Sequence, residues 1–304
     1  MDYFLQNLIN ALQWGSFYAI ISIGYSMVYG VLMLFNFAHG DIFMVGTYIG
    51  FGVATLLLAL FSALMPGWLI FIITIFITMI LAAWVGVLVE VVGYRPLRSA
   101  PRASAAITGL MIGIIFETGN LILLGAKRLS FPSLIESTSY NIGGIYFTNV
   151  KIMIVVISLL LMLALHLFIQ KTKWGMAMRA MSYDFLAVPL MGVSINIIAP
   201  LTFAVGAGLA SVAGVLYGQA YPVLDPYMGI FLGWKAFVAA ILGGRGSIMG
   251  AALAGYLLGF IEIFVAMAFP STFRDLIAYS IILIILTYRP RGFFGMEYST
   301  KLRL

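Results

Sequence analysis

Three ionisable residues stand deep inside long apolar runs of this sequence: Glu117, Lys235 and Glu262. If such runs cross a bilayer, a charge at that depth is costly and marks a candidate functional site. We expect an intramembrane ion pair drawn from these three residues, with Lys235 and Glu262 pairing across a bundle. The alternatives are a purely structural pair, or a Lys235 side chain that extends toward the membrane surface.

A polar break, Asn36-Phe37-Ala38-His39-Gly40-Asp41, interrupts what would otherwise be one long apolar stretch. One interpretation is that Asn36, His39 and Asp41 place polar groups along a substrate pathway. The other is a turn at the inner membrane surface, with Asp41 capping the helix that follows. The sequence leaves both open.

Several kinds of chemistry are excluded or disfavoured. The chain has no cysteine, which excludes thiol catalysis and cysteine-based metal sites. It has no G-x-x-x-x-G-K-[ST] motif, so it does not hydrolyse ATP by the P-loop route. The two histidines, His39 and His166, lack partners at metal-ligand spacing, so we expect no metal site. Ser26 and His39 have no spacing that would make a nucleophile and base, so we do not expect an enzyme.

The composition places these residues in a membrane protein. Of 304 residues, 63% are hydrophobic and 9% charged, whereas soluble domains carry roughly 25% charged residues. Long apolar runs reach the ~20 residues that cross a bilayer as a helix. They lie at about 9–35, 41–65, 68–92, 103–125, 152–170, 200–221, 248–269 and 274–288, with a shorter stretch at 228–243. We therefore predict an all-α polytopic membrane helix bundle, with eight long transmembrane helices plus one short or broken helix, in a single transmembrane domain over residues 1–304.

The basic residues indicate orientation rather than nucleic-acid binding, although the net charge is +6. Lysine and arginine gather in the connections 93–102 and 171–199 and in the C-terminal tail, which predicts that these parts are cytoplasmic. Asp2 precedes the first run without any basic residue, so we expect no cleavable signal and an external N-terminus. Alternation puts the connection 126–151 outside despite Lys127, Arg128 and Lys151.

The same parity requires the short stretch 228–243 to cross the membrane. Its 16 residues are few for a full span at 1.5 Å per residue. Prolines 222 and 226 precede it and a glycine-rich turn follows, and irregular backbone at membrane depth persists only where protein or a wet cavity shields it. We therefore expect a short or broken helix beside the pathway. The predicted pathway residues are Asn36, His39, Asp41, Lys235, Gly243 and Gly244.

Glycine pairs spaced four residues apart recur in the apolar runs. Such pairs let helices approach closely where lipid gives no hydrophobic drive, so five of them together predict a tight bundle. They are Gly46/Gly50, Gly109/Gly113, Gly214/Gly218, Gly229/Gly233 and Gly255/Gly259.

The connection 171–199 is neither a span nor a separate domain. We expect a short cytoplasmic helix at about 177–190, and the alternatives are a plain loop or a docking helix for a cytoplasmic partner. Because an ordered insert this long needs a surface to pack against, docking is favoured.

An ordered set of motifs carries a family resemblance from Gly15 to Gly292. The motifs are Tyr25-Ser26-Met27-Val28-Tyr29-Gly30, the break at 36–41 with Gly46, Glu90 with Tyr94-Arg95-Pro96-Leu97-Arg98, Gly175 with Arg179-Ala180 and Met191-Gly192-Val193, Ala213-Gly214-Val215-Leu216-Tyr217-Gly218, and Lys235-Ala236-Phe237 followed by Gly243-Gly244-Arg245-Gly246-Ser247. In this order they resemble the LivH-type permease of bacterial branched-chain amino acid ABC importers.

The resemblance implies a set of partners in the bacterial inner membrane. These would be a second, LivM-like permease, two cytoplasmic LivG/LivF-like ATPases that bind ATP and Mg, and a periplasmic or surface-anchored binding protein. The chain itself would hold no cofactor and would contact lipid but no nucleic acid. The segment 171–199 would couple it to the ATPases through Gly175, Arg179, Ala180, Asp184, Ala187 and Gly192.

The implied function is import of branched-chain amino acids by alternating access. A urea or short-amide permease of the same superfamily is the nearest alternative. An ion-coupled transporter acting alone is a further one, and it would need a carboxylate site. Glu117 with Glu262 is the only candidate for that site.

Overall fold

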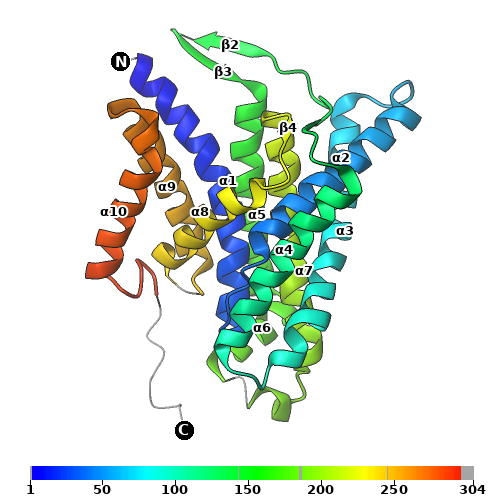
Figure 1. Cartoon of the computed structure of the whole chain (residues 1–304), viewed down its shortest axis with the longest axis vertical. Helices are drawn as coiled ribbons and strands as arrows, with labels where there is room; N and C mark the ends of the chain where they lie inside the picture. Colours follow the sequence, from blue (N-terminus) through cyan, green and yellow to red (C-terminus); the bar gives the residue numbers. More distant parts are fainter. Residues whose placement is uncertain (1, 143, 185–186, 245, 296–304) are drawn as a thin grey trace.

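The computed structural model describes residues 2–142, 144–184, 187–244 and 246–295, and it folds into a helix bundle with short strands at one end (Figure 1). The elements are α1 (Asp2–Leu32), α2 (His39–Phe61), α3 (Gly67–Leu88), a π-helical turn (Val89–Tyr94), a 3-10 turn (Arg95–Leu97), α4 (Arg102–Leu124), β1 (Leu129–Ser130), β2 (Ser139–Ile142), β3 (Ile145–Thr148), α5 (Asn149–Lys171), α6 (Lys173–Tyr183), a 3-10 turn (Val188–Met191), α7 (Ile195–Ala220), β4 (Val223–Leu224), α8 (Met228–Gly243), α9 (Ile248–Ala268), a 3-10 turn (Ser271–Phe273) and α10 (Arg274–Tyr288).

The predicted fold class is confirmed. In the described part of the chain, eight helices are long and apolar enough to cross a membrane, and α8 is a shorter apolar helix. The prediction left open whether this ninth helix is broken. It is continuous over its 16 residues; β4 and a turn precede it at 221–227, and the chain leaves the helix at Gly244. Figure 1 shows α8 steeply inclined, crossing α1 near the middle of the bundle.

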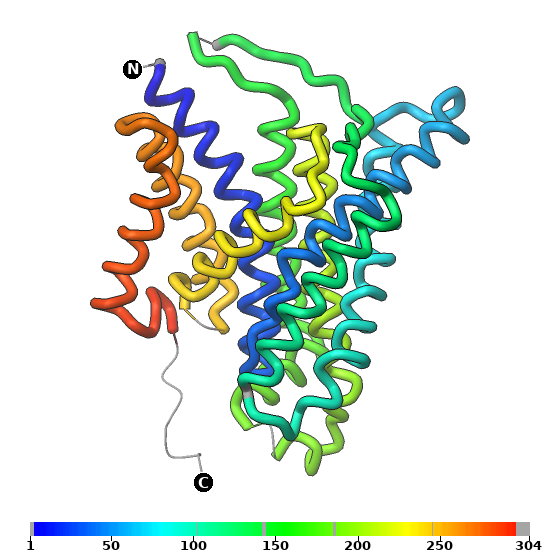
Figure 2. The backbone as a smooth tube through the Cα atoms, viewed as in Figure 1, coloured from blue at the N-terminus to red at the C-terminus, as the bar shows by residue number. Residues whose placement is uncertain are grey.

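The two ends of the bundle differ in what they carry. The chain begins at the same end as the β2–β3 hairpin, whereas α6 lies at the opposite end (Figure 2). The connection between α4 and α5 stays at the N-terminal end, where β1 pairs antiparallel with β4 and β2 with β3. Despite its basic residues, this connection lies at the same end of the bundle as the N-terminus, as the alternation of the spans requires.

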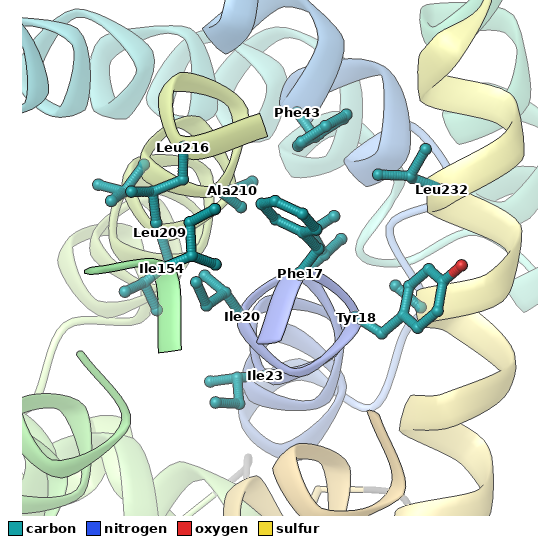
Figure 3. Packing of buried hydrophobic residues seen from close by; sticks show 14 of the residues in the cluster. Phe17, Tyr18, Ile20, Ile23, Phe43, Ile154, Leu209, Ala210, Leu216 and Leu232 are labelled. Atoms are coloured by element: carbon teal, nitrogen blue, oxygen red, sulfur yellow. The ribbon is translucent and has the colours of Figure 1, made fainter. Parts of the chain in front are cut away.

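Helices α1 and α7 form the centre of the bundle. In α1, 89% of the most apolar window is buried, against 11% in α4 and in α10. Figure 3 shows Phe17 and Ile20 of α1 packed among Phe43 of α2, Ile154 of α5 and Leu209 of α7. The outer faces of α4 and α10 are consequently left for lipid or for a partner.

Close backbone contact joins α1 to α9. A Cβ atom added at Gly255 would stand 2.5 Å from the Ala19 Cα, and one at Gly259 would stand 2.6 Å from the Gly15 Cα. Because lipid tails are as apolar as leucine, dispersion contact of this kind, rather than the hydrophobic effect, holds membrane helices together. The predicted glycine spacing thus marks a real helix–helix contact here.

Candidate functional site

The polar break turns the chain back into the bundle. α2 begins at His39, whose ring centroid lies 4.6 Å from that of Tyr25 on α1. Tyr25 stands seven residues before the end of α1 at Leu32, which is about 10 Å along the helix axis. The first turn of α2 therefore lies inside the protein rather than at its surface.

Asn36, and not Asp41, stabilises this turn. The Asn36 Oδ1 accepts hydrogen bonds from the Ala38 amide at 3.2 Å and from the Tyr94 hydroxyl at 3.0 Å. The N-cap residue of α2 is Ala38, and no side chain caps the helix. The capping role considered for Asp41 is wrong, and its carboxylate is available for another purpose.

That carboxylate faces a cavity of about 280 Å³ between α4 and α8. We call this space the carboxylate cavity. It is lined by Tyr25, Phe37, Gly40, Asp41, Leu110, Met111, Ile114, Glu117, Gly229, Ile230, Gly233, Trp234 and Phe237. Its walls are mostly apolar and aromatic, with two carboxyl groups as the charged groups among the lining residues.

Glycine residues of α8 and α4 pack against the Asp41 carboxyl group on two sides. A Cβ atom at Gly229 of α8 would stand 2.8 Å from its Oδ1, and one at Gly113 of α4 would collide with its Oδ2. The side chain of Asp41 is nearly buried, with a residue exposure of 7%, yet its Oδ1 has no hydrogen-bond partner among the described residues. Glu117 interacts with the Asp41 carboxyl group both electrostatically and through a side-chain hydrogen bond. One oxygen of the Asp41 carboxyl group, Oδ1, is therefore a buried acceptor without a partner among the described residues.

The opposite face of α8 carries a separate group of charges, which we call the ion-pair cluster. Lys235 Nζ lies 2.9 Å from Glu262 Oε1 on α9 and 2.9 Å from Asp275 Oδ1 on α10. Arg274 Nε lies 3.9 Å from Glu262 Oε2, which also accepts a hydrogen bond from the Tyr18 hydroxyl at 2.9 Å. Two cations and two carboxylates balance, and the cluster ties α1, α8, α9 and α10 together beside a cavity of about 290 Å³.

Removing the central cation should destabilise the protein strongly. In Lys235→Met, Glu262 is left buried with the more distant Arg274 as its remaining cation, so we expect a loss of about 3–5 kcal/mol of stability, typical of a broken buried pair. Thermal unfolding of the detergent-solubilised protein measures this. The double variant K235M/E262Q should recover part of the loss because it no longer buries that charge, and equal melting of K235M and the unsubstituted protein would contradict the assignment.

The remaining pathway candidates lie outside both cavities. His39 is buried against Gly24, and its Nε2 has no hydrogen-bond partner in the described parts of the chain. Gly243 and Gly244 form the α8–α9 turn, where the Phe294 amide donates to the Gly243 carbonyl at 3.0 Å. Arg245 of the same turn lies outside the described residues.

The structure therefore brings the predicted residues together in two separate sites. Asp41 lies with Glu117 in the carboxylate cavity, and Lys235 pairs with Glu262 in the ion-pair cluster. The pair expected between Lys235 and Glu262 forms, whereas Glu117, the third candidate, is not part of the ion-pair cluster. Sequence reasoning missed Arg274 and Asp275, because they lie at the edge of the short connection between the runs 248–269 and 274–288, where charged residues are ordinary.

At the other end of the bundle, α6 is set firmly on the end of α5. The Gly175 amide donates to Thr172 Oγ1 at 3.0 Å, and the Arg179 guanidinium donates to the Ile169 carbonyl. Gly175 also packs against the Ile169 backbone so closely that a Cβ atom would not fit. The junction between α5 and α6 is therefore closely packed, and we call it the α5–α6 elbow.

The single helix predicted at 177–190 is replaced by two separate elements. α6 ends at Tyr183, and the 3-10 turn Val188–Met191 follows. The Asp184 amide donates to the Ala180 carbonyl at 3.2 Å, and Asp184 Oδ1 accepts from the Ala187 amide at 3.0 Å. Gly192 ends the second piece with a φ of 81°, a backbone conformation that favours glycine.

This segment has an anchored face and a free face. Met178, Met181 and Val188 are buried against Val31 of α1 and Ile198 of α7. Tyr183, Leu190 and Met191 are 78%, 89% and 79% exposed at the end of the bundle. Large apolar side chains gathered outside the membrane-length helices are typical of a protein–protein contact.

Together these features define a multi-pass helical membrane protein with two internal charged sites and an outward apolar segment at one end. Residues 7–286 match the family described as branched-chain amino acid transport system / permease component. The chain belongs to this permease family.

Curated relatives extend over nearly the whole chain. The permease protein BraD of the high-affinity branched-chain amino acid transport system of Pseudomonas aeruginosa is 38% identical over 98% of both chains. The corresponding LivH proteins of Escherichia coli K12 and Salmonella typhimurium are 35% and 36% identical, again over 98% of both chains. The solved structure of PsaBC from Streptococcus pneumoniae in complex with Fab has a TM-score of 0.46 and 16% identity over 100% of this chain and 96% of that chain, a likeness too weak to define the fold.

Proposed function

We propose that this chain is the permease subunit of an ATP-binding-cassette importer that carries branched-chain amino acids into the cytoplasm by alternating access. The family match over almost the full length supports the class, and the relatives named above are all named for branched-chain amino acid transport. Nothing favours the urea alternative. The ion-coupled alternative loses its candidate site, because Glu117 and Glu262 lie in different sites.

The observation that carries the proposal is the segment formed by α6 and the 3-10 turn. Its inner face is buried on α1 and α7, the two central helices, and its outer face presents Leu190 and Met191 to the surroundings. ATPase subunits would dock there, with ATP and Mg in their own sites. Their movement would act on the α5–α6 elbow, which is joined to the central helices α1 and α7. Such a connection passes a two-state motion from one site to another.

A second, LivM-like permease subunit would cover the carboxylate cavity. The residues at its rim, among them Leu110, Met111 and Trp234, are 40–49% exposed. Exposing the two carboxyl groups of this cavity to the hydrocarbon of the bilayer would cost free energy. A neighbouring subunit that encloses the cavity with protein and water would avoid that cost. A substrate-binding protein would deliver the ligand at the opposite end from α6.

Cysteine labelling tests the orientation that this proposal requires. The chain contains no cysteine, so single cysteines can be introduced at Asn141 in the β2–β3 hairpin and at Met191. In cells that express the chain without its ATPases, a membrane-impermeant maleimide should label N141C in intact spheroplasts and M191C only after permeabilisation. The reverse pattern would place α6 outside and would refute the coupling role.

A further inference from the structure

The carboxylate cavity has the chemistry of a site for a primary ammonium group attached to an apolar chain. We propose that Asp41 Oδ1 receives the α-ammonium of the amino acid as it crosses, while the aromatic and aliphatic wall receives its side chain. The inference rests on the proposed function, and it assigns the substrate contact within that function to named atoms.

The first support is the unsatisfied acceptor. Asp41 is only 7% exposed, and its Oδ1 has no hydrogen-bond partner among the described residues. A buried carboxylate oxygen without a hydrogen bond is costly, and a ligand that donates one removes the cost. An ammonium group brings three donors and a positive charge, so it is the natural partner.

The second support is the packing around the Asp41 carboxyl group. Gly113 and Gly229 approach the two oxygens of Asp41 from α4 and α8, and any side chain at either position would occupy their space. Glu117 adds a second carboxyl group that interacts with Asp41 by charge and by a side-chain hydrogen bond, so a cation bound there would offset the negative charge of the pair.

The third support is the wall. Phe37, Trp234 and Phe237 face the cavity with Ile114 and Ile230, and no lysine or arginine is among its lining residues. A volume of about 280 Å³ approaches the lower end of ordinary ligand sites, which is about 300 Å³, and suits a small amino acid. Because this wall offers the substrate carboxylate no cation, the amino acid should bind the cavity weakly. Weak binding is what a site along a transport pathway requires, since the substrate must leave it again.

The main test is leucine uptake by the complete importer with Asp41→Asn, which keeps the size and removes the charge. We expect kcat/KM for uptake to fall by about 10- to 100-fold, the cost of a charge-assisted hydrogen bond, while assembly with the ATPases is unchanged. Glu136→Gln, the same type of change at an exposed position, should have no effect. Uptake at the unsubstituted rate by D41N overturns the inference and leaves the proposed function standing, whereas no leucine uptake by the unsubstituted importer overturns the function itself.

If D41N does not assemble, labelling of the unsubstituted importer by dicyclohexylcarbodiimide decides the matter. Peptide mapping would measure the modification of Asp41 with leucine, with leucinamide, or with 4-methylpentanoate, which lacks the ammonium group. We expect leucine and leucinamide to protect Asp41 and 4-methylpentanoate to leave it exposed. Absence of this ammonium-specific protection would overturn the inference.

Discussion

Leucine uptake should be abolished when Leu190 and Met191 are both replaced by glutamate. These side chains are 89% and 79% exposed, so the change does not disturb the packed core of the permease. In the proposed complex they enter the ATPase interface, where two buried carboxylates would remove apolar contact and add desolvation cost. Because central interface residues each contribute about 2 kcal/mol or more, uptake should fall at least about 100-fold and the ATPases should no longer co-purify.

Tyr146→Glu is the matched control for this variant. Tyr146 is also a large, exposed side chain, at 60%, but it lies in the β2–β3 hairpin at the other end of the bundle. ATPase co-purification should be unchanged in this variant. Normal ATPase binding by L190E/M191E would show that the partner docks elsewhere.

Gly175→Val should uncouple ATP hydrolysis from leucine uptake without releasing the ATPase subunits. The added side chain cannot fit against the Ile169 backbone, so α6 must lift away from the end of α5. Overpacking of this kind costs about 1–3 kcal/mol, which is enough to displace the elbow but not to unfold the bundle. We expect uptake to fall about tenfold or more while the ATPases still bind and hydrolyse ATP, as measured in proteoliposomes by parallel uptake and phosphate-release assays.

Gly52→Val provides the comparison for this substitution. Gly52 lies on the exposed side of α2, and a Cβ atom there would meet nothing within 4 Å. The same change of side chain should therefore leave transport intact. If G175V transports as well as G52V, the α5–α6 elbow is not part of the coupling.

Hydropathy predicted the spans closely where the helices are straight and uniformly apolar. The predicted run 248–269 is helix Ile248–Ala268, and 228–243 is helix Met228–Gly243. The first run failed at its end, because residues 33–35 are apolar yet not helical. There Phe35 stacks on Tyr29 with ring centroids 4.3 Å apart, and hydropathy cannot distinguish such a returning loop from a helix.

The sites were predictable only in part. Lys235 and Glu262 could be paired from their opposite charge and depth, but Asp275 lies at the very start of the predicted run 274–288, and its position in the sequence does not indicate a buried partner. Asp41 and Glu117 are far apart in sequence on α2 and α4, and nothing local indicates that they share a cavity. Glycine spacing indicated that helices approach one another, and only the structure shows that Gly229 and Gly113 make room for a carboxylate.

The most direct test of the account is uptake of radiolabelled leucine by proteoliposomes. One set would contain the chain with its second permease, ATPases and binding protein, and another would contain the purified chain alone. We predict uptake only in the first set and only with ATP on the side of the ATPases. Uptake by the chain alone, with or without an ion gradient, would contradict a permease that depends on partners docked at α6.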